Sequence, residues 1–452
     1  MTDDRDTIFA LSSGRPPAAI AVVRISGARA GPALESLSGR MPRPCEAKLV
    51  RVRDPETGEV IDEALALWFP APHSETGEDV AELQVHGGRA IIAAVLAALG
   101  KISGLRHAER GEFTRRAFEN GRMDLTAAEG LADLVAAETQ AQRRQAFQHM
   151  KGLLGQRAET WRERLLAALA LVEAGIDFPD EGDVPQLQVG NQALSIVGAL
   201  AEEISDALGG RGEQLREGFR VAIAGPPNAG KSTLFNRLAR RDAAIVSPYP
   251  GTTRDVIEIH LDLDGYPVTI LDTAGMRPSD DPIEQEGVRR ATEQARNADL
   301  VLWISDAADV DALRRRQEFV VSNHAAVWTV VNKMDLVADR DATQALFRGC
   351  EPVFFVSSAT GRAVDELLGS LGQFAEKSFS LEPALVTRQR HRAHLQEALS
   401  SLIEAQKVAR TGRDELLAEH LRLAAQALGK LLGRVDVEDV LDVIFREFCI
   451  GK

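Results

Sequence analysis

The stretch FRVAIAGPPNAGKST (Phe219–Thr233) decides the fold. An apolar, β-branched run leads into a loop that contains Gly225 and Gly230, and a helix is expected to begin near Lys231. This order of strand, loop and helix is typical of a phosphate-binding loop. The glycines let backbone N–H groups fold around phosphate oxygens, and the helix N-terminus adds its dipole. Lys231 would reach the β- and γ-phosphates and Ser232 would ligate Mg²⁺, so the stretch predicts a nucleotide site in an α/β domain.

Two later segments indicate which nucleotide this loop binds. AVWTVVNKMD (Ala326–Asp335) is an apolar strand that ends in a polar loop, and VFFVSSATG (Val353–Gly361) supplies the next strand and the loop expected under the base. The carboxylate of Asp335 only accepts hydrogen bonds, which suits the N1–H and amino donors of guanine and does not suit adenine. The predicted ligand is therefore GTP. The residues predicted to bind it are Asn228, Ala229, Gly230, Lys231, Ser232, Thr233, Ser247, Pro248, Tyr249, Pro250, Gly251, Thr252, Thr253, Asp272, Thr273, Ala274, Gly275, Asn332, Lys333, Asp335, Ser357, Ser358 and Ala359.

Residues for magnesium binding and hydrolysis lie between these segments. Asp272, which ends the apolar strand in VTILDTAG (Val268–Gly275), can hold the Mg²⁺ shell, and Thr253 in SPYPGTTRD is the candidate second Mg²⁺ ligand. Regulatory GTPases orient the attacking water with a glutamine directly after the DxxG glycine. Met276 occupies that position here and cannot orient water. Catalysis must come from elsewhere: Asn228 could help seat a monovalent cation, and Glu284 or Glu286 could position the water.

The sequence changes character along its length, which predicts several domains. β-branched runs alternate with an Ala/Leu helix at first, a helical region follows, strands and helices then alternate around the phosphate loop, and helical sequence resumes. We therefore expect a P-loop GTPase domain with a parallel sheet, inserted into a helical domain and preceded by an α+β domain. The predicted boundaries are 1–119, 120–216, 217–376 and 377–452.

Composition excludes several classes of protein. The net charge of −14 over 452 residues argues against a general affinity for nucleic acid. The three cysteines are too far apart to suggest a disulfide framework or a zinc site. The acidic N-terminus lacks a signal-peptide pattern, and the apolar runs are too short to span a bilayer, so a cytoplasmic protein is expected. Two basic stretches, Arg106–Arg116 and Arg388–Leu395, are expected to be solvated surface.

Taken together, the motifs resemble those of the TrmE/MnmE family of tRNA-modification GTPases, over essentially the full length. The GTPase motifs alone leave open a ribosome-assembly GTPase similar to Era or Der, or a regulatory one. The N-terminal motifs, the insertion into helices and the CIGK end favour the tRNA-modification family. The segments that carry the resemblance are DTIFALSS, VVRISG, TGEDVAELQVHGG, GEFTRRAF, IDFPDE, GPPNAGKST, GTTRD, DTAGMR, NKMD and FCIGK.

The resemblance implies a homodimer formed through the N-terminal domains, with potassium promoting association of the G domains and GTP hydrolysis. It favours Glu284 over Glu286 as the catalytic glutamate. The implied metal ligands are Ser232 and Thr253 for Mg²⁺, and Asn228, Ser247, Tyr249 and Thr252 for K⁺.

The resemblance also implies a tetrahydrofolate site in the N-terminal domain, for a 5-formyl or 5,10-methylene derivative. Its residues would be Arg24, Glu82, Arg122 and Lys452, although taken alone the first three would be surface charges. Arg122 stands where the family often has lysine. Cys449, four residues from the C-terminus, becomes a candidate catalytic residue. The implied activity, in a heterotetramer with the FAD-containing MnmG (GidA), adds a carboxymethylaminomethyl or aminomethyl group to C5 of the tRNA wobble uridine.

Overall fold

The computed structural model describes residues 6–177, 186–241, 243–245, 258–272, 298–309, 311, 314, 316–317, 325–348, 352–379, 384–435, 438–446, 448 and 450–451. The chain divides into two compact units. The first comprises Met1–Ala132, His149–Ile204 and Ala393–Lys452, and the second comprises Asp133–Gln148 and Ser205–Arg392. Among the helices in the described ranges, none combines the length and apolar composition that a membrane crossing requires.

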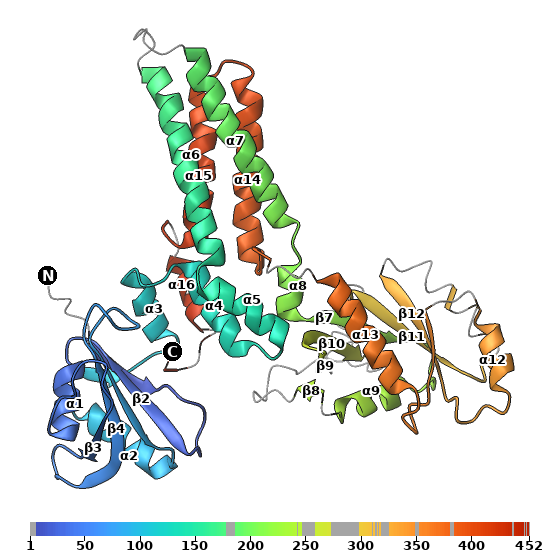
Figure 1. Ribbon diagram of the computed structural model, residues 1–452, viewed down its shortest axis with the longest axis horizontal. Helices are drawn as coiled ribbons and strands as arrows, with labels where there is room; N and C mark the ends of the chain where they lie inside the picture. Colours follow the sequence, from blue (N-terminus) through green and yellow to red (C-terminus); the bar gives the residue numbers. More distant parts are fainter. Residues whose placement is uncertain are drawn as a thin grey trace, which may run out of the picture. The chain divides into compact units, whose positions relative to one another are not determined.

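A six-stranded sheet in the order β3-β4-β5-β2-β1-β6 forms the N-terminal part of the first unit (Figure 1). All neighbouring strands are antiparallel except β1 and β6, which are parallel. One face packs on α1 (Ala30–Ser38) and α2 (Arg89–Gly100), and Ile8 and Ala10 on the other face pack on Phe113 of α3 (Glu112–Glu119). The strands are β1 (Thr7–Leu11), β2 (Ile20–Ser26), β3 (Lys48–Arg53), β4 (Val60–Phe69), β5 (Val80–His86) and β6 (Leu105–His107).

Long helices from both sides of the nucleotide domain pack together in the first unit. The apolar stripe of α15 is buried, as its helical spacing predicts: Leu417, Leu421, Ala424, Leu428 and Leu431. This stripe lies on the helix that packs most extensively against α6 (Figure 1). The helices are α4 (Leu125–Ala136), α5 (Gln140–Met150), α6 (Leu153–Asp177), α7 (Gln186–Leu208), α14 (Gln389–Ala409), α15 (Asp414–Leu432) and α16 (Glu438–Arg446), of which α4, α5, α7 and α14 extend into the second unit.

The second unit contains a seven-stranded sheet in the order β13-β12-β11-β7-β10-β9-β8. The neighbours from β13 to β10 are parallel, and β9 and β8 add an antiparallel edge. This confirms the predicted parallel-sheet domain. The strands are β7 (Phe219–Ala224), β8 (Ala244–Ile245), β9 (Glu258–Leu263), β10 (Tyr266–Asp272), β11 (Leu300–Asp306), β12 (Ala326–Asn332) and β13 (Val353–Phe355), and the helices are α8 (Gly212–Glu217), α9 (Lys231–Ala239), α12 (Arg340–Leu346) and α13 (Val364–Ser378).

The chain enters and leaves the nucleotide domain at one place. A Cβ on Gly212, at the start of α8, would lie 2.3 Å from the carbonyl oxygen of Val386. Asp133 Oδ1, on α4, accepts hydrogen bonds from Arg216 Nε at 3.0 Å and from Arg388 Nη2 at 2.7 Å. Both crossings, the segments by which the chain enters and leaves the nucleotide domain, are therefore bonded to the same carboxylate. Arg388 is only 8 % exposed, so the expectation that its stretch is solvated surface is wrong at this residue.

Candidate functional site

The phosphate-binding loop is shaped by two glycines with positive φ. Gly225 has φ 142°, and a Cβ there would lie 2.2 Å from the carbonyl oxygen of Ile304 on β11. Gly230 has φ 94°, and a Cβ there would lie 2.2 Å from Asn332 Nδ2. Side chains would therefore collide with fixed atoms at both ends of the loop, which explains why glycine is required.

Lys231 opens α9 and folds back over the loop. Its Nζ donates to the carbonyl oxygens of Gly225 at 2.9 Å and Pro226 at 2.8 Å. Asn228 has φ 62°, in the left-handed region, and Ser232 is exposed in the first turn of the helix. Asn228, Lys231 and Ser232 thus lie together at the carboxyl end of β7, where a helix N-terminus favours an anion.

Asn332 joins the phosphate loop to the loop predicted to lie under the base. Its Nδ2 donates to the carbonyl oxygen of Ala229 at 2.9 Å, and its Oδ1 accepts from the backbone N–H of Ser358 at 2.9 Å. Only 1 % of Asn332 is exposed. Ser357 Oγ donates to Asp335 Oδ1 at 2.5 Å, which orients the carboxylate predicted to recognise guanine.

Asp306 is a site residue that the sequence reasoning missed. It ends β11 beside Asn332 of β12, and its Oδ2 lies 2.7 Å from Lys333 Nζ. Burial raises the pKa of Asp306, but the hydrogen bonds from Lys333 and from the N–H of Ala308 outweigh it and leave that pKa below its ordinary value. Lys333, whose φ is 63°, is thereby fixed by an ionised partner. An acidic residue at the carboxyl end of a parallel strand was the signal that could have identified it.

A second missed residue, Arg237, lies on α9 and contacts the base loop. Its Nε donates to the carbonyl oxygen of Ser358 at 2.5 Å, and its Nη2 donates to that of Ala359. A cavity of about 410 Å³ flanks this contact. It is lined by Thr233, Asn236, Arg237, Arg240, Arg241, Ser358 and Ala359.

Several predicted site residues lie outside the described residues. For Asp272, the structure describes the backbone at the end of β10 and not the side chain. The others are Ser247, Pro248, Tyr249, Pro250, Gly251, Thr252, Thr253, Thr273, Ala274, Gly275, Glu284, Cys449 and Lys452.

Two of the predicted folate residues, Arg24 and Glu82, form a pair across neighbouring strands. They face each other in the β2–β5 register, with Arg24 Nε 2.9 Å from Glu82 Oε1. Arg24 Nη1 also lies 2.5 Å from Glu75 Oε2, and its guanidinium carbon lies 5.8 Å from the centre of the Phe113 ring. Each side chain of the Arg24–Glu82 pair is 17 % exposed, so these residues are not ordinary surface charges.

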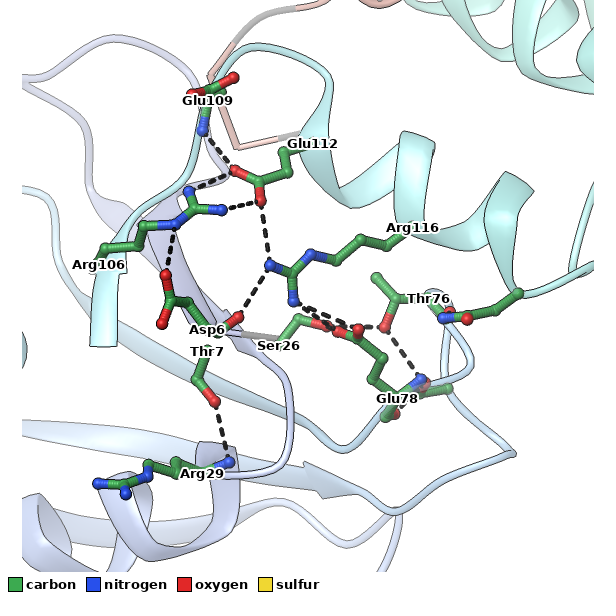
Figure 2. A network of polar contacts seen from close by, with 12 residues as sticks. Asp6, Thr7, Ser26, Arg29, Thr76, Glu78, Arg106, Glu109, Glu112 and Arg116 are labelled. Carbon is green, nitrogen blue, oxygen red and sulfur yellow. Dashed lines mark hydrogen bonds and ion pairs between the residues drawn. The ribbon is translucent and has the colours of Figure 1, made fainter. Parts of the chain in front are cut away.

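The loop that carries Glu75 is held by a polar network under α3 (Figure 2). Arg116 Nη1 lies 3.1 Å from Glu78 Oε2, and Ser26 Oγ donates to the same carboxylate oxygen at 2.7 Å. Arg116 Nη2 donates to the carbonyl oxygen of Asp6 at 2.8 Å and to Glu112 Oε1 at 3.0 Å. Because Arg116 is 4 % exposed, the expectation of solvated surface is also wrong here.

Glu112 stays ionised within this network. Burial raises its pKa, but hydrogen bonds from Arg106 and from the N–H of Glu109, together with the charge of Arg116, bring the pKa of Glu112 below its ordinary value. The same loop approaches Arg122, whose Cγ would lie 3.2 Å from a Cβ on Gly77. The structure therefore places exposed Arg122 beside the loop whose Glu75 contacts Arg24.

Removing the Arg116 side chain is expected to loosen the N-terminal sheet. Arg116→Ala takes the buried cation away from Glu78, whereas Glu112 keeps Arg106, and the loss of one partner of a buried ion pair costs about 3 kcal/mol in such cases. We expect the free energy of opening, measured by hydrogen exchange in β1 and β5 peptides, to fall by about that amount. Arg115→Ala is the matched control. Arg115 pairs at the surface with Glu119 and Asp442, so its loss is expected to cost less than about 1 kcal/mol. Equal losses in the two variants would contradict the assignment.

The end of the chain lies against the N-terminal sheet. Ile450 forms an antiparallel bridge with Arg110, and Gly451 has φ 98°. A Cβ on Gly451 would lie 2.1 Å from the carbonyl oxygen of Leu11, whose neighbour Ala10 faces Arg24 in the β1–β2 register. The two residues that flank this segment, Cys449 and Lys452, lie outside the described residues, but the segment itself is close to the Arg24 strand.

The parallel sheet, the glycine-shaped loop and the Asn332–Asp335 loop define the class of this protein. It is a P-loop GTPase whose nucleotide domain is inserted between helices. Two family models together match nearly all of the chain. The model described as the MnmE helical domain matches residues 125–449, and the model described as the GTP-binding protein TrmE N-terminus matches residues 7–122. The chain belongs to the TrmE/MnmE family of tRNA modification GTPases.

Relatives match the chain from end to end. The tRNA modification GTPase MnmE of Rhodopseudomonas palustris (strain BisB18) is 54 % identical over 458 residues and 100 % of both chains. MnmE of Bradyrhizobium sp. (strain BTAi1) is 55 % identical over 449 residues and 99 % of both chains. Among solved structures, Aquifex aeolicus Era is 24 % identical over 41 % of this chain and 66 % of Era, with a TM-score of 0.28.

Proposed function

We propose that this protein is a potassium-dependent, cytoplasmic GTPase that acts on tRNA as a homodimer with an FAD-containing partner, MnmG. The complex would add a carboxymethylaminomethyl or aminomethyl group to C5 of the wobble uridine. One observation carries the proposal: the chain's end, at Gly451, lies on the same sheet as the Arg24–Glu82 pair. A GTPase that worked only as a switch would not need this arrangement.

The nucleotide site would work with Mg²⁺ and K⁺. Ser232 and Thr253 would ligate Mg²⁺, and Asn228, Ser247, Tyr249 and Thr252 would hold K⁺. When bound, these cations supply positive charge beside the phosphates. The left-handed conformation of Asn228 and the exposed Ser232 in the first turn of α9 fit these roles. Glu284 would position the water, and Asp335 would hold guanine.

The N-terminal site would hold a tetrahydrofolate that supplies the one-carbon unit. Arg24 and Glu82 present opposite charges, which suits a ligand with both carboxylates and amino donors. Arg122 and Lys452 would add cations for the glutamate tail, and Cys449 would take part in the chemistry.

Analysis of wobble nucleosides tests this proposal against the ribosome-assembly alternative. Cells that lack the protein are expected to lose the C5 modification, and the wild-type gene is expected to restore it. Gly451→Val is expected to fail in restoring it while purified protein still hydrolyses GTP, because the side chain cannot fit against Leu11. Cys449→Ser is expected to behave in the same way. Unchanged wobble uridines in the deletion strain would support the alternative instead.

A further inference from the structure

The guanidinium of Arg24 is paired with two carboxylates in the N-terminal sheet domain. Arg24 Nε lies 2.9 Å from Glu82 Oε1, and Arg24 Nη1 lies 2.5 Å from Glu75 Oε2. One positive and two negative charges leave this group of three side chains with an excess of negative charge. An anionic ligand that approaches Arg24 would therefore be repelled by the carboxylates already there.

The two carboxylates are held in different ways. Glu82 lies on β5 directly opposite Arg24 in the β2–β5 register, and its side chain is 17 % exposed. The pleat of the sheet fixes the direction of that side chain. Glu75 lies in the loop between β4 and β5, and its side chain is 47 % exposed. Because water and salt weaken an ion pair with an exposed member, the contact of Glu75 is the easier one to break.

The backbone on either side of Glu75 is anchored, and the residues that follow it belong to the polar network of Figure 2. Before it, Ser74 Oγ donates to the carbonyl oxygen of Glu78 at 2.5 Å. After it, the carbonyl oxygen of Thr76 accepts from Asn120 Nδ2 at 2.8 Å. Both neighbours are buried, Ser74 at 5 % and Thr76 at 0 % exposed. The side chain of Glu75 can therefore leave the guanidinium by changing its rotamer, without any opening of the loop.

Glu75 occupies a donor that an acceptor oxygen of a ligand would need. We propose that Glu75 is an affinity-determining residue of the N-terminal site, whose carboxylate holds Arg24 until an acceptor oxygen of a bound tetrahydrofolate takes its place. This inference rests on the proposed folate site. The ligand binds only those molecules in which Glu75 has turned away, so its apparent affinity is lowered by the fraction of molecules that are in that state.

The two carboxylates should then have opposite effects on the affinity for folate. Loss of Glu75 removes a competitor for Arg24 and tightens binding. Loss of the charge on Glu82 removes the acceptor proposed for the amino donors of the ligand and weakens binding. If Glu75 only supported the local structure, its loss would leave binding unchanged or weaken it, so the sign of the change identifies its role.

Calorimetric titration of the full-length protein with 5-formyltetrahydrofolate measures these effects. Glu75→Ala is expected to lower the dissociation constant about fivefold, which corresponds to an ion pair that blocks Arg24 in roughly four of five molecules. Glu75→Gln keeps the size of the side chain and loses its charge, and is expected to lower the constant at least about twofold. Glu82→Gln is expected to raise it about tenfold.

Glu63→Ala is the matched control. Glu63 pairs with Arg51 across β3 and β4 of the same sheet at 2.9 Å, and its side chain is 56 % exposed. It is therefore a glutamate–arginine pair of similar exposure that does not include Arg24, and its loss is expected to leave folate binding unchanged. GTP hydrolysis, expected to be normal in all of these variants, confirms that each of them is folded.

The outcomes distinguish this inference from the proposed function. Tighter binding by Glu75→Ala, with Glu63→Ala unchanged, supports the role of Glu75. A wild type that binds the folate together with a Glu75→Ala variant that binds it equally or more weakly would overturn that role and leave the folate site in place. If neither the wild type nor Glu75→Ala binds the folate at millimolar concentration, the proposed folate site fails and this inference fails with it.

Discussion

Asparagine in place of Asp335 is expected to exchange the preference for GTP for a preference for xanthosine triphosphate. In the proposed site, the carboxylate of Asp335 would accept from the two donors on the guanine edge, and xanthine replaces one of those donors with a carbonyl group. With guanine bound, the NH₂ group of an asparagine at this position would face one of the two donors of the base. With xanthine bound, the same NH₂ group would donate to the oxygen that xanthine carries there. We expect the dissociation constant for GTP to rise at least about 100-fold, because unmatched hydrogen-bonding groups are penalised strongly in a site built to pair them.

The contacts of Asp335 indicate that asparagine can replace it without disturbing the neighbouring loop. Its Oδ1 accepts from Ser357 Oγ at 2.5 Å, a bond that an asparagine oxygen can retain. Asp339→Asn is the matched control, because Asp339 caps α12 by accepting from the N–H of Ala342 and asparagine caps helices equally well. Fluorescent-nucleotide titration measures both variants. Unchanged binding of GTP by Asp335→Asn would show that this carboxylate does not contact the base.

Exchange of potassium for sodium at equal ionic strength is expected to slow GTP hydrolysis at least about tenfold, with GTP binding nearly unchanged. Met276 stands where other GTPases orient water with glutamine, so the site lacks one catalytic group. A positive charge on the phosphates at this point is worth roughly 10³–10⁵ in rate when an arginine finger supplies it. A cation seated at Asn228 would supply that charge, and sodium, which is smaller and more strongly hydrated, would fit the same ligands poorly.

Variants distinguish the contribution of the bound cation to the rate of hydrolysis from the contribution of the residue that positions the water. Asn228→Gly keeps the left-handed backbone and removes the side chain, so it is expected to lower the rate in potassium toward the rate in sodium. Glu284→Ala is expected to bind GTP normally and to turn over at least about 100-fold more slowly. Glu286→Ala, two residues further along, is the control and is expected to turn over normally. Steady-state phosphate release measures all of them, and equal rates in the two salts would remove the cation from the mechanism.

The features that the sequence predicts well are those encoded by neighbours along the chain. FRVAIAGPPNAGKST specifies a strand, a turn that needs glycine and a helix within fifteen residues, and β7 and α9 lie at those positions. The stripe from Leu417 to Leu431 is likewise visible as a helical repeat and is buried. Local spacing is sufficient for such features because the period of each element is fixed by its backbone geometry.

The features that were missed depend on pairs far apart in the sequence. Arg237 and Ser358 are 121 residues apart, and Lys333 and Asp306 are 27 apart. Arg116 and Arg388 lie in basic stretches that read as solvated surface, yet each is buried against carboxylates supplied by other elements. The sequence shows only that a charged side chain needs either water or a partner of opposite charge. Which of the two it contacts depends on the fold.

The contact between Gly212 and Val386 has a consequence for how this architecture could have arisen. Because the two crossings touch, a short peptide could join them after the intervening segment is removed, and the remaining helices would meet much as before. Two chain crossings that lie side by side are the arrangement in which the insertion of a domain into a host fold is tolerated. The two halves of the helical scaffold are thus separate in the gene and adjacent in the molecule.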